Sequence, residues 1–128
     1  MEPIAIAAAT LAAKWAAESI VKEAAKSAFT SLKPVYDWIV VNLRGRPASE
    51  AVLDNLAMQP NETTTIEAVA LIVNEAIQKD PALKSNLDAL LERAKQDDAT
   101  HSFVVQVFEG ARVGKIVTIG TVNGNVTI

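Results

Sequence analysis

The chain contains no cysteine and a single histidine among its 128 residues. It therefore offers no disulfide framework, no thiolate metal site and no cysteine nucleophile. Aromatic residues make up only 5% of the sequence, whereas half of it is hydrophobic. Its core must consequently be built from Ala, Leu, Val and Ile. An alanine-rich composition of this kind favours closely packed helices over a β-sandwich.

The chain also lacks clustered positive charge. Residues 1–46 contain six Lys and Arg and four Asp and Glu. Residues 47–102 contain four basic and ten acidic residues, and residues 103–128 contain two basic residues and one acidic residue. Because phosphate binding requires clustered Lys and Arg, nucleic acid is not expected as a partner.

A secretory signal and a long apolar run are missing from the N-terminal region. Glu2 stands where a signal peptide has basic residues, and Lys14 ends the apolar run of residues 4–13. That run is much shorter than the ~20 residues that span a bilayer. These features predict a cytoplasmic chain.

Helix-forming sequence fills the first hundred residues and predicts an all-α bundle of four or five helices. Pro34 is expected to break or kink the first helix, and an Arg-Gly-Arg-Pro stop at 44–47 to end the second stretch. Thr64 and Glu67 form a capping-box pattern, and Asp80 before Pro81 is an expected N-cap. The expected helices cover residues 3–33, 35–43, 49–58, 64 to the Asp80 cap, and 81 to about 96.

The first of these helices carries one polar stripe, in which charged residues recur every four positions: Lys14, Glu18, Lys22 and Lys26. Glu18 is placed to pair with Lys22, and the stripe is interpreted as the solvated face of the helix. The rest of the circumference is apolar. A helix of this kind is either central in a bundle or in contact with lipid.

From residue 103 onward the composition favours β-structure. Residues 103–108 are β-branched and aromatic, and residues 115–128 combine β-formers with an Asn-Gly turn signal. A boundary is therefore expected near residue 100. It separates a helical domain, 1–100, from a short C-terminal β-forming, amyloid-type tail, 103–128.

The tail has three possible destinations: an isolated hairpin, a small sheet packed on the bundle, or pairing with the same segment of other chains. The third is favoured because Val-Thr-Ile occurs twice, at 117–119 and 126–128, in sequence that has low charge and no proline. Stacked Asn ladders and interdigitating aliphatic side chains are typical of a steric zipper. The expected self-assembly residues are Ile116, Val117, Thr118, Ile119, Gly120, Val122, Asn123, Gly124, Asn125 and Val126.

The sequence Val117-Thr118-Ile119-Gly120, followed by Asn123, resembles amyloid motifs related to the RIP homotypic interaction motif. That motif has an aliphatic residue, Gln, an aliphatic residue and Gly, with Asn three positions later; here Thr118 replaces the Gln. The run Gly-Thr-Val-Asn-Gly-Asn-Val at 120–126 is similar to bacterial amyloid signalling sequences.

An alanine-rich helical domain that opens Met-Glu-Pro-Ile-Ala-Ile-Ala and ends in such a tail is similar to bacterial Bell-domain proteins. These resemble fungal HeLo-type prion-controlled toxins and the helical executioner domain of necroptosis. The resemblance implies a prion-like effector of cell death or innate immunity. A partner, an NLR-like ATPase with a matching motif, would template the tail, and the clustered helical domains would disturb the membrane.

The first helix supplies the residues expected to contact that membrane: Ile4, Ile6, Leu11 and Trp15. The positive stripe would favour an anionic inner leaflet, so the chain is expected at the inner face of the cell membrane once activated. The alternative is a non-enzymatic adaptor or structural oligomerisation module, whose tail pairs with the sheet edge of a partner or completes a homo-oligomer by β-augmentation.

No pattern in the sequence points to an enzyme, a cofactor or a metal site. His101 has no acid–base partner at a suitable spacing and is interpreted as a solvated linker residue. The adjacent Asp97 and Asp98 do not face one site. Trp15 and Trp38, at helical positions, are interpreted mainly as core or interhelix anchors.

Overall fold

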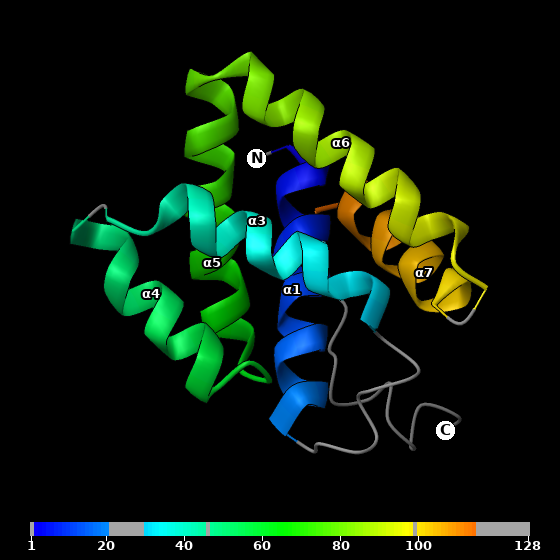
Figure 1. Ribbon diagram of the computed structural model, residues 1–128, viewed down its shortest axis with the longest axis horizontal. Coiled ribbons are helices and arrows are strands. Elements are labelled where there is room, and N and C mark those ends of the chain that lie inside the picture. The colour runs from blue at the N-terminus through cyan, green and yellow to red at the C-terminus, as the bar shows by residue number, and fades with distance from the viewer. Residues whose placement is uncertain (1, 21–29, 46, 99, 115–128) are drawn as a thin grey trace.

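The computed structural model describes residues 2–20, 30–45, 47–98 and 100–114. Within these ranges the chain is all-helical, with six α-helices, one 3-10 turn and no strand. The all-α prediction is thereby confirmed for the described part of the chain (Figure 1). The elements are α1 (Pro3–Ile20), η2 (Thr30–Leu32), α3 (Lys33–Leu43), α4 (Pro47–Met58), α5 (Thr63–Lys79), α6 (Pro81–Gln96) and α7 (His101–Arg112).

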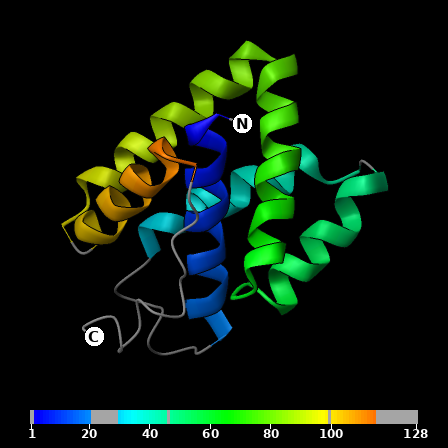
Figure 2. The same ribbon diagram turned by 180° about the vertical axis from the view of Figure 1, so that it is seen from behind.

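Helix α1 is the centre of the bundle. It contacts each of the other five described helices, α5 most extensively. Figures 1 and 2 show α4 and α5 on one side of it, α6 and α7 on the other, and α3 crossing it. Its alanines let the neighbouring helices approach closely, and most of its side chains are buried around the whole circumference.

The start of α1 is held at the end of the bundle where α5 meets α6. The Glu2 amide donates to Asn74 Oδ1 at 2.9 Å, and the Glu2 carboxylate lies 2.8 Å from Lys84 Nζ. The hydrogen bond and the negative charge of Glu2 raise the pKa of Lys84 above its ordinary value.

Local signals set several helix ends as expected. The Asp80 carboxylate accepts a hydrogen bond of 3.0 Å from the Ala82 amide. Pro81 follows Asp80 at the first helical position. Gly45 adopts φ +98° directly after α3, a left-handed conformation that costs little only for glycine. The capping box at Thr64 is wrong, because α5 begins at Thr63 and its N-cap, Glu62, makes no side-chain cap hydrogen bond.

The sequence predicts one continuous helix over residues 3–33, and the structure differs from this prediction at the end of that range. Thr30–Leu32 form a 3-10 turn, and a separate helix, α3, begins at Lys33. Pro34 lies in the first turn of α3, where its missing N–H would have no helical acceptor in any case. Residues 21–29 lie outside the described part of the chain.

The prediction of β-structure at 103–108 is wrong. These residues belong to helix α7, whose buried side chains are Phe103, Val104, Val107 and Ala111. Their spacing of one, three and four residues follows a helical period and places them on one face. Burial of that face against α1 outweighs the modest β-preference of Val and Phe. The rest of the expected tail, 115–128, lies outside the described residues.

A proline in α7 tests this helix directly. Gln106 is exposed at the middle of α7, so Gln106→Pro should lower the free energy of unfolding by about 3 kcal/mol through the lost hydrogen bond and the ring clash. Chemical denaturation of the full chain measures the change, with Gln106→Ala as the control that keeps the helix. If both variants were as stable as the native chain, residues 103–108 would not be part of the folded bundle.

Candidate functional site

The four side chains expected to contact a membrane all lie on α1 and face the interior of the bundle. Leu11 is fully buried and Ile6 is 6% exposed, while Ile4 and Trp15 are partly buried and pack against the core. Spacings of seven and four residues put Ile4, Leu11 and Trp15 on one face of α1, whereas Ile6 lies on another. In this state the four residues contribute to the core.

Trp15 joins α1 to α3. Its ring centroid lies 4.7 Å from that of Tyr36, with the planes tilted by 40°. The ammonium group of Lys33 lies 5.9 Å from the Trp15 ring centroid. In this state of the chain Trp15 is therefore an interhelix anchor, in agreement with its interpretation from the sequence.

The polar stripe of α1 is not a solvated face where the structure describes it. Lys14 is only 1% exposed, and its Nζ lies 2.7 Å from Glu18 Oε2, whose side chain is 12% exposed. Glu18 thus pairs with the lysine before it in sequence; the expected partner, Lys22, lies outside the described residues. The Lys14 ammonium also lies 5.6 Å from the ring centroid of Phe103 in α7.

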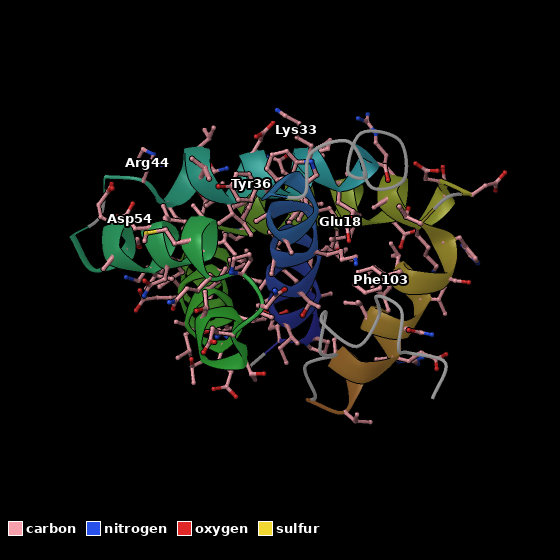
Figure 3. The ribbon with its side chains drawn as sticks, turned by 90° about the horizontal axis from the view of Figure 1, so that it is seen from below. Glu18, Lys33, Tyr36, Arg44, Asp54 and Phe103 are labelled. Atoms are coloured by element: carbon pink, nitrogen blue, oxygen red, sulfur yellow. The ribbon has the colours of Figure 1, made fainter. Side chains whose placement is uncertain are left out.

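This buried pair links α1 to α7. In Figure 3, Tyr36 and Phe103 lie on different sides of α1, and Glu18 lies on the side of Phe103. Removing an ammonium and a carboxylate from water is costly, and their mutual attraction offsets that cost only when the geometry is good. A facing aromatic ring adds a favourable cation–π contact. Phe103 of α7 therefore lies against the lysine of a charged pair in the second half of a largely apolar helix.

Polar groups also hold the connection between α6 and α7. Thr100 is fully buried, and its hydroxyl donates to the Ala94 carbonyl at 3.1 Å and lies 3.2 Å from the Ser31 hydroxyl. His101 is exposed, and its Nδ1 lies 2.8 Å from the Lys95 carbonyl. His101 thus stabilises a turn between two helices.

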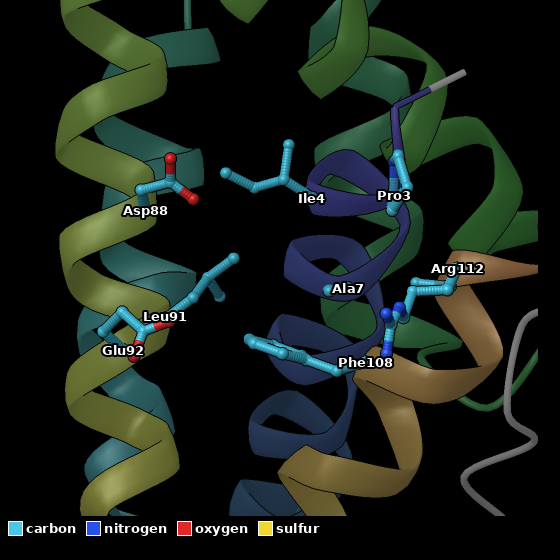
Figure 4. A pocket seen from close by; sticks show the side chains of 9 residues that line it. Pro3, Ile4, Ala7, Asp88, Leu91, Glu92, Phe108 and Arg112 are labelled. Carbon is cyan, nitrogen blue, oxygen red and sulfur yellow. The ribbon is translucent and has the colours of Figure 1, made fainter.

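A pocket of about 150 Å³ lies between α1, α6 and α7. Figure 4 shows the side chains that line it, among them Ile4, Leu91 and Phe108. Charged side chains stand at its edges: Asp88 and Glu92 on α6, and Arg112 on α7. The sequence carries no local signal for this pocket, because its walls come from segments that are far apart in the chain.

The described residues contain no group of three or more His, Asp or Glu side chains that could hold a metal ion. Over the same ranges no helix combines the length and apolar character that crossing a bilayer requires. The ten residues expected to drive self-assembly, 116–120 and 122–126, lie outside the described part of the chain. No protein-family model, curated protein or solved structure matches this sequence.

The buried pair gives a prediction with an internal control. Glu18→Gln removes the carboxylate but keeps the side-chain volume, so the free energy of unfolding should fall by about 3 kcal/mol. The second pair, Lys33 and Asp37, has the same four-residue spacing, but its side chains are 54% and 50% exposed. Asp37→Asn should therefore cost less than about 1 kcal/mol.

Chemical denaturation at neutral pH measures both changes. The double variant Lys14→Met, Glu18→Gln removes both charges, so it should recover much of the stability that Glu18→Gln loses alone. Equal losses for Glu18→Gln and Asp37→Asn would show that the Lys14–Glu18 pair within α1 is not desolvated.

Proposed function

We propose that this chain is a non-enzymatic effector of amyloid signalling in bacterial cell death or immunity. A matching motif on an NLR-like ATPase templates its tail, and the helical bundle then acts on an anionic membrane. The single observation that carries the proposal is the position of α7. This helix covers the buried pair of α1 and leads, within a few residues, into the motif that begins at Val117.

The tail supports the assembly half of the proposal. Its two Val-Thr-Ile copies, its Asn residues and its lack of proline suit stacking of identical chains. Polymerisation raises the local concentration of every attached bundle without requiring a new contact in the bundle itself. Weak affinity of one bundle for a membrane then becomes strong binding of the whole assembly.

Helix α1 supports the membrane half. It has 18 residues, most of them Ala, Ile or Leu, so it is about 27 Å long at 1.5 Å per residue. Lys14, in its middle, favours a position in the plane of the interface, where the ammonium reaches the headgroups while the apolar side chains enter the acyl layer. Displacement of α7 would uncover the face of α1 that carries Lys14, while α3, α4, α5 and α6 still cover the rest.

One observation favours a second candidate function, that of an adaptor or structural oligomerisation module. Because α1 contacts every other described helix, its release would remove the centre of the core. In an adaptor the bundle stays folded, and only the tail pairs, by β-augmentation with a partner or with other copies. The two functions therefore differ in whether α1 leaves the bundle.

Cysteine labelling separates them, because the native chain has no cysteine. Ala9→Cys places one thiol at a fully buried position of α1, and Ala57→Cys places one at an exposed position of α4 as the control. Full-length protein is seeded with fibrils of a peptide spanning 115–128, in the presence of anionic vesicles that contain a dye. Maleimide labelling, thioflavin fluorescence and dye release are recorded together.

The effector function predicts that Cys at position 9 is protected at rest and reacts after seeding, in step with dye release. Continued protection with intact vesicles, while fibrils form, would support the adaptor. Ile119→Pro removes a ladder donor, so it should abolish fibrils and every later step. Substitution of Leu11 by lysine is unsuitable as a test, because Leu11 is fully buried and the bundle itself would be destabilised.

A further inference from the structure

The pocket between α1, α6 and α7 has no role in the proposed function, and its chemistry is distinctive. Its floor is apolar and is formed by Ile4, Ala7, Leu91, Phe108 and Ala111. A cavity of about 150 Å³ lined by apolar side chains holds a group of the size of a benzene ring. The floor therefore suits one phenyl ring or one branched alkyl group, and it is too small for a folded partner segment.

The charges at the edges have a fixed arrangement. Asp88 and Glu92 are four residues apart on α6, so they project from the same face of that helix. Arg112 projects from the last turn of α7, and in the view of Figure 4 helix α1 and the side chain of Phe108 lie between its guanidinium and the two carboxylates. Among the described residues, no ion pair joins Arg112 to either carboxylate. Both signs of charge therefore remain available to a ligand.

We propose that this pocket binds a small zwitterion that carries one compact apolar group. The ammonium group of the ligand lies beside Asp88 and Glu92, its anionic oxygens accept from Arg112, and the apolar group fills the floor. A purely cationic ligand would leave Arg112 unused, and an uncharged one would leave all three charges unused. Charge-assisted hydrogen bonds at both ends give such a site its selectivity.

This chemistry has two sources, a free amino acid with a large apolar side chain and the phosphoethanolamine head of a lipid, whose adjoining acyl segment would fill the floor. Titration of the ¹⁵N-labelled full-length chain, followed by the amide shifts of Ala7, Leu91 and Ala111, distinguishes them. The probes are L-phenylalanine, L-leucine and short-chain phosphatidylethanolamine below its micelle concentration. Phenethylamine and 3-phenylpropionate are the matched single-charge analogues of phenylalanine.

At least one zwitterionic probe should bind about tenfold more tightly than either single-charge analogue, because each analogue loses one charged hydrogen bond. Binding of the amino acids alone would identify a free metabolite, and binding of the lipid alone would identify a headgroup site. The proposal is overturned if no zwitterion binds, or if either single-charge analogue binds as tightly as the tightest-binding zwitterion.

Exposed side chains allow the site to be tested without loss of the fold. Arg112→Gln and Glu92→Gln alter the two edges of the pocket, and both residues are exposed. Each should weaken binding of the zwitterion about tenfold. Arg93→Gln and Glu67→Gln are the matched controls, because these residues are also exposed but do not line the pocket. Unchanged binding in both pocket variants would place the ligand elsewhere and overturn the assignment.

Discussion

The architecture depends on the burial of α1, most of whose side chains are covered by the other helices. An alanine-rich helix can be surrounded on all sides because small side chains let the neighbouring helix axes approach closely, and α1 contacts every other described helix. The same arrangement leaves Lys14 only 1% exposed, and Glu18 and the ring of Phe103 lie beside its ammonium group. Because Phe103 belongs to α7, this buried charge also contributes to the packing of the last described helix.

Several helix ends could be predicted because their signals are local. The Asp80 cap and the glycine that follows α3 each depend on residues within a few positions of one another. Helix α7 could not be predicted from composition, since Val and Phe become helical only when a neighbour buries their face. Attention to the spacing of Phe103, Val107 and Ala111 would have indicated a helix.

The candidate site was harder to predict for a related reason. A four-residue spacing of Lys and Glu gives the same sequence pattern on an exposed helix face and on a buried one. Lys33 and Asp37 are the exposed case in this chain, and Lys14 and Glu18 are the buried case. The alanines that surround Lys14 were the available signal. The pocket left no local signal, because α1, α6 and α7 meet there only in the folded chain.

The burial of α1 also sets the energy that the proposed effector function requires. Its release removes the core, so the cost approaches the whole stability of the domain, about 5–15 kcal/mol. Assembly of the tail concentrates bundles but does not itself favour the open state. The membrane must therefore bind the uncovered helix more tightly than the bundle does. The buried pair lowers the free energy needed to release α1, because Lys14 and Glu18 regain solvation when the helix leaves the bundle. The apolar side chains meanwhile pass from one apolar environment to another. A charged pair in the second half of an otherwise largely apolar helix thus makes the closed bundle less stable than an all-apolar core would be, at the place where opening would begin.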